Sequence, residues 1–303
     1  MAWKSIKYHN GSEYRGELDA HGKKQGFGMF RYADGGSYSG EWLNDQKHGR
    51  GTMVYASGDK YEGEWVNGRY EGKGAYTHKS GFVYAGDFKE DCRCGYGRMT
   101  SPDGSYYEGQ WRDNDRNGKG SYHWADGSVY QGSWADDGRQ GKGVIDVPGS
   151  YRYEGDWWRD KMSGYGILTL SNGDRFEGYW RNGHIEGSGS YFYNAGGCYE
   201  GEWHLDMREG TGKLTFPDGS VYNGQWYNDY IQGSGSYRGA DGSEYVGEFK
   251  RGLRSGKGKM TYPDGSVYEG DWYFDLRDGQ GVMTCPDGRI ISGKWKNGKP
   301  NND

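Results

Sequence analysis

The segment Tyr61–Tyr76 reads Tyr-Glu-Gly-Glu-Trp-Val-Asn-Gly-Arg-Tyr-Glu-Gly-Lys-Gly-Ala-Tyr, and it decides the fold of this 303-residue chain. Aromatic residues and glycine alternate at its start. Tyr61, Gly63 and Trp65 therefore share one face of a predicted strand, while the two glutamates point the other way. Gly68 stands in the polar turn that follows, where only Gly, Asp or Asn occurs in the related segments. These residues tolerate a positive φ, so the pattern predicts a tight hairpin.

A Gly-x-Gly pair begins the predicted second strand of this hairpin. Glycine weakens the interior of a strand unless another group must approach the backbone closely. We therefore expect a Tyr or Trp ring from the neighbouring strand to lie across the bare backbone. The residues that define the predicted hairpin are Tyr61, Gly63, Trp65, Gly72 and Gly74.

The same pattern recurs along almost the whole chain. After one step of 24 residues, every later step is 23 residues, and a fixed period in this range indicates a repeat architecture. The predicted fold class is all-β: an elongated rod formed by a single-layer antiparallel sheet of about 12–13 stacked hairpins with one aromatic face. The motif starts at Tyr14, Tyr38, Tyr61, Tyr84, Tyr107, Tyr130, Tyr153, Phe176, Tyr199, Tyr222, Tyr245, Tyr268 and Ile291.

The phase of the repeat divides the chain into three predicted parts. Residues 1–13 form an N-terminal half-hairpin cap, because Ile6 and Tyr8 occupy second-strand apolar positions. Residues 14–298 form a continuous array with a period of 23, and residues 299–303 form a polar tail. The last motif, Ile291–Trp295, is expected to have no second strand.

Composition excludes several classes of function. A formal net charge of −5 gives the whole chain no attraction to nucleic acid, so no nucleic-acid partner is expected. No apolar run is long enough for an export signal or a membrane span, which predicts a cytoplasmic protein. We interpret the four cysteines as free thiols in a reducing compartment; they are Cys92, Cys94, Cys198 and Cys285.

The sequence shows no pattern typical of a catalytic, cofactor or metal site. The histidines fall at unrelated repeat positions, without a nucleophile–base spacing. Cys92-x-Cys94 lacks a second close cysteine pair, and no Gly-x-Gly string opens a helix as a dinucleotide loop does. We therefore predict a protein that is not an enzyme and that has no catalytic residues, cofactor or metal.

The repeat resembles the MORN family (membrane occupation and recognition nexus), whose signature is Tyr-Glu-Gly-Glu-Trp, a polar turn, Gly-x-Gly and Pro-Asp-Gly-x-x-Tyr. The resemblance covers about residues 8–298. It implies a scaffold that acts in cytoskeletal structures such as ciliary axonemes, radial spokes or membrane–cytoskeleton junctions. The partners it implies are other proteins of a cytoskeletal or axonemal complex, and some relatives hold an extended or helical peptide against the sheet.

Charged residues recur in two columns. The acidic column comprises Glu17, Glu41, Glu64, Asp87, Asp156, Glu202, Glu248 and Asp271. The basic column comprises Lys24, Lys47, Arg93, Arg116, Arg139, Arg208, Arg254 and Arg277. We interpret them as a solvated face with cross-strand ion pairs. The alternative is a basic edge for anionic lipid headgroups, formed by Arg93, Arg116 and Arg139.

Apolar residues replace polar ones at several positions expected to face outward. Clustered exposed apolar residues suggest a contact with a partner. The predicted partner-binding residues are Trp158, Met162, Tyr179 and Ile185, with a looser second group of Tyr227, Ile231, Tyr273 and Phe274.

The functional hypothesis is a non-enzymatic scaffold or adaptor rod that organises a cytoskeletal or ciliary (axonemal) assembly through protein–protein contacts. The sequence leaves open a homodimer, with two copies side by side or face to face through the aromatic face. The alternative is a peripheral phosphoinositide-binding tether between membrane and cytoskeleton.

Overall fold

The computed structural model describes residues 3–301, which fall into two compact units. Unit 1 comprises Met1–Pro148 together with Trp158–Asp160, and unit 2 comprises Gly149–Trp157 together with Lys161–Asp303. Residues 1–2 of the expected cap and 302–303 of the expected tail lie outside the described residues. The division into cap, array and tail stays a prediction.

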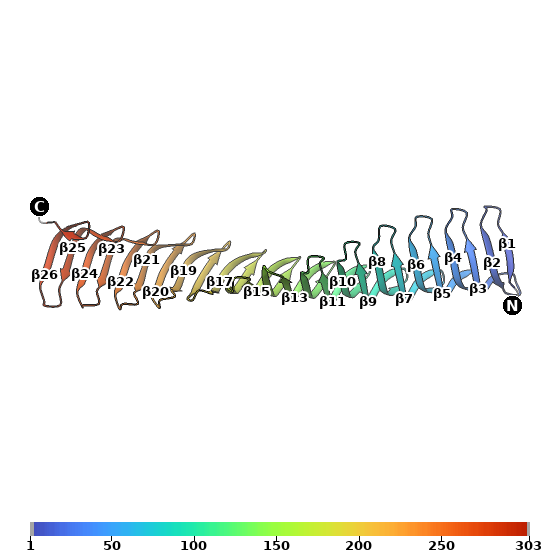
Figure 1. Cartoon of the computed structure of the whole chain (residues 1–303), viewed down its shortest axis with the longest axis horizontal. Helices are drawn as coiled ribbons and strands as arrows, with labels where there is room; N and C mark the ends of the chain where they lie inside the picture. The colour runs from blue at the N-terminus through green and yellow to red at the C-terminus, as the bar shows by residue number, and fades with distance from the viewer. Residues whose placement is uncertain (1–2, 302–303) are drawn as a thin grey trace. The chain divides into compact units, whose positions relative to one another are not determined.

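Unit 1 contains thirteen strands in chain order: β1 (Lys4–Lys7), β2 (Glu13–Leu18), β3 (Lys24–Arg31), β4 (Ser37–Leu43), β5 (Gln46–Val54), β6 (Lys60–Val66), β7 (Arg69–Thr77), β8 (Val83–Lys89), β9 (Cys92–Thr100), β10 (Tyr106–Arg112), β11 (Asp115–His123), β12 (Val129–Ala135) and β13 (Gly138–Val147). Each strand pairs antiparallel with the next. The unit is therefore an open sheet of consecutive hairpins (Figure 1).

Unit 2 follows the same plan. Its strands are β14 (Tyr151–Trp158, whose last residue belongs to unit 1), β15 (Lys161–Leu170), β16 (Arg175–Arg181), β17 (His184–Phe192), β18 (Cys198–His204), β19 (Met207–Thr215), β20 (Val221–Tyr227), β21 (Tyr230–Arg238), β22 (Glu244–Lys250), β23 (Leu253–Thr261), β24 (Val267–Tyr273), β25 (Leu276–Thr284), β26 (Ile290–Lys296) and β27 (Lys299–Pro300). From β15 onward each strand pairs antiparallel with the next. The all-β class with stacked antiparallel hairpins is confirmed in both units.

The chain adds a short strand where none was expected. β27 pairs with β26, with Lys299 opposite Lys296. The intervening Asn297 and Gly298 both have positive φ, as a tight hairpin turn requires. The Asn-Gly pair is a turn signal in the sequence. The two residues that follow it, Lys299 and Pro300, were expected to belong to the polar tail.

The hairpin turns place two residues, and not one, in the left-handed region. In the turn between β4 and β5, Asn44 has a φ of 49° and Asp45 a φ of 67°. This is the type I′ pattern, whose twist matches the flanking strands. Pairing resumes at once, with Leu43 opposite Gln46. The second strand therefore begins at Gln46, three residues before Gly49, the first glycine of the Gly-x-Gly pair. The expectation that Gly-x-Gly begins the strand is wrong.

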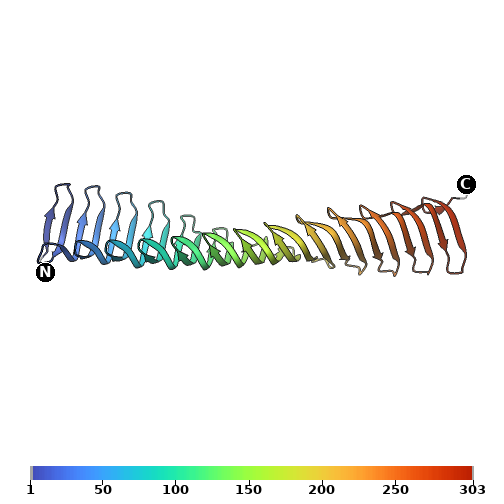
Figure 2. The same ribbon diagram turned by 180° about the vertical axis from the view of Figure 1, so that it is seen from behind.

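A β-bulge interrupts the ladder of almost every hairpin at the Gly-x-Gly pair. In the β4–β5 hairpin, Gly40 lies opposite Gly51, but the next aligned pair is Trp42 and Lys47. The extra residues of the bulge lie on β5 and include Gly49, the first glycine of its pair, which has a φ of 56°. Bulges bend the strand that carries them. Figures 1 and 2 show this bend in the strands of unit 1.

The core is built where Tyr rings lie across the bare glycine backbone. Tyr61 is fully buried, and its hydroxyl donates a hydrogen bond to the Glu64 carbonyl at 2.9 Å. A Cβ added to Gly63 or Gly74 would stand 2.6 Å or 2.4 Å from the Tyr61 hydroxyl oxygen. The expected close approach of a ring to the Gly-x-Gly backbone is confirmed.

Trp rings join one hairpin to the next. The Trp65 Nε1–H donates to the Gly51 carbonyl of the preceding hairpin at 3.1 Å. Its ring packs edge-on against Tyr38 at 5.3 Å and Tyr61 at 5.1 Å between centroids. Each hairpin thus buries its aromatic face against its neighbour, which is how a repeat too small for its own core becomes stable.

Candidate partner-binding surfaces

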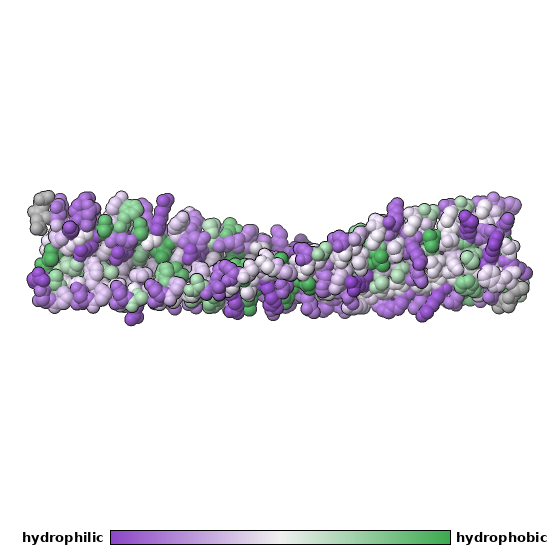
Figure 3. Space-filling view, viewed as in Figure 1, coloured by the Kyte–Doolittle hydropathy of each residue, from purple (hydrophilic) through white to green (hydrophobic). Residues whose placement is uncertain are grey.

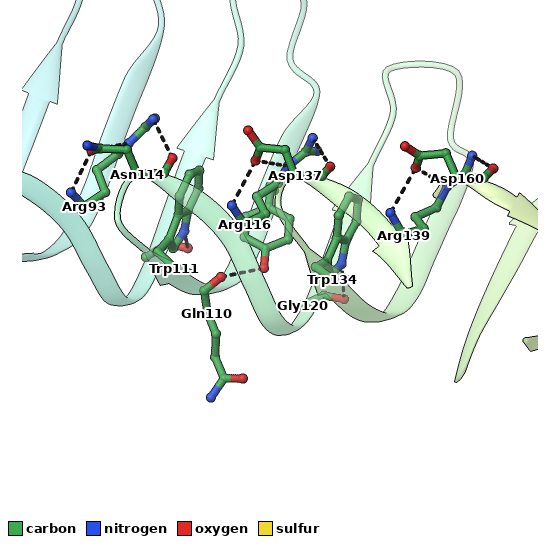
Figure 4. Close-up of polar contacts among 12 residues, drawn as sticks. Arg93, Gln110, Trp111, Asn114, Arg116, Gly120, Trp134, Asp137, Arg139 and Asp160 are labelled. Carbon is green, nitrogen blue, oxygen red and sulfur yellow. Dashed lines mark hydrogen bonds and ion pairs between the residues drawn. The ribbon is translucent and has the colours of Figure 1, made fainter. Parts of the chain in front are cut away.

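The basic column lies on the aromatic face and stabilises the repeat. The Arg116 backbone N–H and its Nε both donate to Asp137 Oδ1, at 2.9 Å and 3.0 Å, and Nη2 donates to the Asp137 carbonyl at 2.7 Å. The guanidinium also lies 4.5 Å from the Trp134 ring centroid. Figure 4 shows the same arrangement for Arg93 with Asn114 and for Arg139 with Asp160. Each of these three arginines therefore anchors the hairpin turn of the following repeat.

Burial and charge pairing change the acid–base behaviour of this column. The Arg116 side chain is 24% exposed, and burial lowers the pKa of Arg93. Burial alone would raise the pKa of Asp137, but hydrogen bonds from the Arg116 N–H groups lower it overall. The expected solvated face is wrong for the basic column: these cations lie opposite or over rings and are bound to a turn. The outward position was predicted for these cations because the second strand was expected to begin at Gly-x-Gly, after them.

The cations follow the Trp residues along the chain. Contacts of this kind, with the charged group 4.2–4.7 Å from a Trp centroid, include Lys24–Trp42, Lys47–Trp65, Arg93–Trp111, Arg116–Trp134, Arg208–Trp226, Arg254–Trp272 and Arg277–Trp295. Where Phe88 and Phe249 replace Trp, the preceding hairpin carries Tyr70 and Ile231 at the basic position. Trp is the better ring for a cation–π contact. The pairing is incomplete, because Met162 and Ile185 stand at the basic position before Trp180 and Trp203.

The acidic column supplies hydrogen-bond acceptors to the backbone of the bulge. The Glu41 carboxylate accepts a hydrogen bond from the Arg50 backbone N–H at 2.9 Å. A Cβ on Gly49 would meet that carboxylate at 2.5 Å, so the acid lies against the glycine of the bulge. Gln110 does the same for Lys119 at 2.7 Å without a charge. The column therefore satisfies backbone groups that the bulge leaves unpaired.

Three of the expected partner-binding residues do not face outward. Ile185 is only 8% exposed and lies directly opposite Trp180, and Ile231 is half-buried opposite Trp226. Met162 is half-buried at the same position of its own repeat. These residues replace the basic column on the aromatic face, because a residue paired across a hairpin from Trp shares its face. Their expected outward position is wrong.

The aromatic members of the expected set are exposed. Trp158, in unit 1, is 53% exposed with the Arg159 guanidinium 5.6 Å from its ring centroid. Tyr179 and Tyr227, in unit 2, are 51% and 59% exposed. Whether any of them binds a partner stays a prediction.

Tyr179 lines a groove on the polar face of unit 2. Its ring packs edge-on against Tyr165 at 5.6 Å, and the groove encloses about 540 Å³. Glu177, Glu202 and Lys213 also line it, so both signs of charge are present. Tyr165 was missed from the sequence; the available signal was an aromatic residue between the two glycines of a Gly-x-Gly pair.

A more extensive exposed apolar set lies at the hairpin turns of unit 2. These side chains are 46–60% exposed, and together they are named the turn patch: Leu205, Tyr227, Tyr230, Tyr273, Phe274 and Leu276. Backbone hydrogen bonds connect the successive turns, for example from Asp229 N–H to the Arg208 carbonyl at 3.1 Å. Hydrophobic residues are visible among hydrophilic ones over the C-terminal strands of unit 2 in Figure 3.

Two members of the turn patch occupy a strained backbone conformation. Leu205 has a φ of 48° and Phe274 a φ of 47°, both at the first central position of a type I′ turn. Asn occupies that position at Asn44, Asn67 and Asn228, as turn chemistry favours. A bulky residue in the left-handed region is an outlier. The turn itself does not call for Leu or Phe, so their presence is a reason to look for a function.

Metal sites, membrane-spanning helices and disulfides are the other features to consider in the described part of the chain. Among residues 3–301, no group of three or more potential metal-ligating side chains is found. Those residues also include no helix with the length and apolar character to cross a bilayer. All four cysteines are free thiols.

Solved structures with some likeness to the chain are known. The TCP domain of SAS-4 (dCPAP) of Drosophila melanogaster, in complex with a proline-rich motif of Ana2 (dSTIL), is 15% identical with a TM-score of 0.33, covering 59% of this chain and 90% of that chain. The TCP10 domain of Danio rerio CPAP, in complex with a STIL peptide, is 11% identical with a TM-score of 0.22, covering 97% and 100%. Likenesses at such low TM-scores carry no inference for this chain. No curated protein matches it.

The repeat itself matches a known family model described as the MORN repeat. The matched segments are residues 14–37, 38–60, 61–83, 84–106, 107–129, 130–146, 153–175, 176–198, 199–221, 222–244, 245–267 and 268–288. They agree in phase with the hairpins of both units. The chain therefore belongs to the MORN repeat family.

Proposed function

We propose that the chain is a non-enzymatic scaffold whose turn patch binds a protein partner within a cytoskeletal assembly. The observation that carries the proposal is the pair Leu205 and Phe274, which are exposed and have positive φ. Their conformation costs about 1 kcal/mol or more each relative to a residue suited to the turn. Binding to a partner is a use that offsets such a cost.

The chemistry of the turn patch suits a protein surface. Tyr and Phe supply large contact areas at low conformational cost, and aromatic residues are enriched at the centres of interfaces. Tyr273 and Phe274 pack edge-on with centroids 4.5 Å apart, which presents two rings as one rigid feature. Lys250 and Arg251 stand at the turn between the two aromatic pairs. The favoured partner therefore has apolar side chains flanking an acidic one.

The cytoskeletal setting rests on the family. Members of the MORN family commonly serve in cilia, axonemes and membrane–cytoskeleton junctions, and the predicted cytoplasmic location agrees with such a setting. The axonemal complex is the specific assembly that we propose. The Tyr165–Tyr179 groove offers a second contact to the same or another protein.

Proximity labelling in the native cell tests this proposal. The wild-type chain is compared with the double variant Leu205→Asn, Phe274→Asn, which carries the residue found in other turns. We expect labelling of cytoskeletal proteins by the wild type and its loss in the variant. A matched control is Val66→Lys, which removes an exposed apolar side chain beside a turn of unit 1. Unchanged labelling with the double variant would contradict the role of the turn patch.

The phosphoinositide tether has less support. Arg93, Arg116 and Arg139 already bind turn residues of the following repeat, so a headgroup must compete with those bonds. Flotation with phosphatidylcholine vesicles, with and without a phosphoinositide, distinguishes the two functions. Recruitment that depends on the phosphoinositide and is lost when these arginines are replaced would favour the tether over the scaffold.

A further inference from the structure

Unit 1 contains a half-enclosed pocket on its aromatic face. It has a volume of about 320 Å³, at the small end for ligand sites. We name it the His78 pocket; its lining residues are Tyr70, Tyr76, His78, Phe82, Tyr84, Phe88, Asp91, Arg93, Met99 and Asn114. Most of the wall is aromatic, and the polar side is formed by Asp91, Arg93 and Asn114.

The pocket occurs where a ring is missing from the repeat. The position two residues after the large apolar residue ends the second strand or follows it. It carries an aromatic ring in half of the twelve hairpins and a smaller side chain in the others; the rings are Tyr32, Tyr55, Trp124, Tyr193, Phe216 and Tyr262. Here the position holds His78. Its Nδ1 lies 2.6 Å from the Ser80 hydroxyl and its Nε2 lies 3.8 Å from Asp59, so the imidazole is held at the return turn.

The rings in the other repeats show what a full pocket looks like. Tyr32 packs against Phe30 of its own hairpin at 4.6 Å, and Phe216 packs against Tyr237 of the following hairpin at 6.3 Å. By the repeat, the equivalents of Phe30 and Tyr237 around position 78 are Tyr76 and Met99. Both line the His78 pocket. The empty space is therefore the place of the missing ring.

The polar side of the pocket also has equivalents in other repeats, where they surround a tyrosine hydroxyl. The Tyr55 hydroxyl is hydrogen-bonded to the Tyr70 hydroxyl of the following hairpin. Burial raises the pKa of Tyr193; the charge of Arg208 lowers it and that of Asp229 raises it, so both side chains lie near the hydroxyl. The equivalents of Arg208 and Asp229 around position 78 are Arg93 and Asn114, both lining residues. At the repeat position of His78, the hydroxyls of Tyr55 and Tyr193 thus lie near polar side chains of later hairpins.

We propose that the His78 pocket binds the tyrosine side chain of a partner polypeptide, which supplies the ring that this repeat lacks. The aromatic walls take the ring, as they do for the chain's own rings in neighbouring repeats. Arg93 is already bonded to Asn114, and Asp91 to the Tyr70 N–H. The hydroxyl therefore meets their remaining donor and acceptor sites, which a ring without a hydroxyl leaves unused. Arg93 disfavours a lysine side chain, and Asp91 disfavours a phosphorylated tyrosine.

Binding of a tyrosine probe to the full chain tests this inference. N-acetyl-tyrosinamide is titrated against protein with 13C-labelled methionine methyl groups, in which Met99 reports on the pocket. We expect a saturable shift of the Met99 signal with a millimolar Kd, and a weaker response to N-acetyl-phenylalaninamide. Absence of a saturable shift, or equal binding of the two probes, would overturn the proposal.

Substitutions locate the binding. His78→Tyr supplies the ring from within the chain, so it should abolish probe binding and raise the Tm. Cys285→Tyr places a ring at the same repeat position in unit 2 and is the matched control, with probe binding unchanged. Phe82→Ser introduces the residue that Ser105 and Ser128 have at that position, and should weaken binding about tenfold by removing one wall. Binding unaffected by both His78→Tyr and Phe82→Ser would overturn the assignment.

This site is independent of the turn patch. The double variant Leu205→Asn, Phe274→Asn should bind the tyrosine probe like the wild type, because its changes lie in unit 2 and the pocket lies in unit 1. Loss of probe binding in that variant would overturn the assignment to the His78 pocket. The two proposals can thus fail separately.

Discussion

The hairpin turns of units 1 and 2 have the same backbone and different surfaces. Within unit 1 the first central turn residue is always polar or charged: Asn44, Asn67, Glu90, Asp113, Asp136 and Arg159. Within unit 2 Leu205 and Phe274 enter the same series. The type I′ turn requires positive φ, which Asn accepts most readily and which Leu205 and Phe274 adopt at a cost. The repeat therefore fixes the backbone of the turn, and a residue that does not suit that backbone indicates selection for a contact.

The aromatic face differs between the units in a second way. Unit 1 keeps a cation at five positions of the basic column, with Tyr70 as the exception. Unit 2 interrupts the column with Met162, Ile185 and Ile231. Unit 1 opens a pocket beside His78, and the turn patch lies in unit 2. The two proposed sites therefore lie in different units.

The largest expected effect is common to both units. Gly74→Val in unit 1 and Gly212→Val in unit 2 each place a side chain 2.4 Å from a Tyr hydroxyl oxygen, of Tyr61 and Tyr199 respectively. We expect each to lower the free energy of unfolding by about 3 kcal/mol or more, measured by urea denaturation. Gly68→Asn is the control, because nothing lies within 4 Å and Asn tolerates its φ of 83°. A glycine variant no worse than this control would show that the rings do not depend on the bare backbone.

Alkaline pH should destabilise both units through their buried tyrosines. Burial raises the pKa of Tyr14 in unit 1 and of Tyr222 in unit 2 to about 12, from 10.0. The unfolded chain therefore loses these protons first as the pH rises above 10. The stabilisation is fully present below pH 10 and is lost between pH 10 and 12, at about 1.4 kcal/mol per pH unit for each such tyrosine.

Thermal unfolding followed by circular dichroism at pH 7 to 12 measures this loss. Tyr222→Phe should make the pH dependence shallower in unit 2, because the titrating group is removed. A stability that stays constant from pH 9 to 12 would contradict the burial of the tyrosine hydroxyls.

Substitutions in the basic column should have a smaller effect, which differs between the two units. Arg116→Met removes the hydrogen bonds to Asp137 and the contact with Trp134, and should cost about 1–2 kcal/mol in unit 1. Ile185→Arg in unit 2 introduces a guanidinium near Trp203 and Asp206, the equivalents of those partners. We expect it to cost less than Arg116→Met or to stabilise. Urea denaturation compares them, and a larger loss for Ile185→Arg would show that unit 2 has repacked around its apolar column.

Substitutions at the first central turn position should have a smaller effect still. Phe274→Asn should raise the free energy of unfolding by about 1 kcal/mol, since Asn accepts a φ of 47° more readily. The reverse change, Asn228→Phe, should cost a similar amount at an equivalent turn of the same unit. Differential scanning calorimetry of both variants measures the shifts in Tm. If Phe274→Asn destabilises the protein, Phe274 is held by packing and the argument from strain fails.

Several structural features could be predicted from the sequence because they depend on local pattern. Tyr61, Gly63 and Trp65 indicate one face of a strand, and the pair Gly72 and Gly74 predicts the close approach of a ring. The exposed position of Tyr179 and Tyr227 also follows from alternation. The positions of Met162, Ile185 and the arginines did not, because they depend on the exact residue at which pairing resumes after the turn.

The period, the hairpins, the family and the residues of the aromatic face could all be predicted from the sequence, since each is repeated many times in a local pattern. The anchoring of the next turn by the basic column, the support of the bulge by the acidic column and the pocket beside His78 are evident only in the folded chain. These features join residues of two or three consecutive hairpins, so no local pattern specifies them. Their geometry is set by the bulge and by ring packing across the sheet.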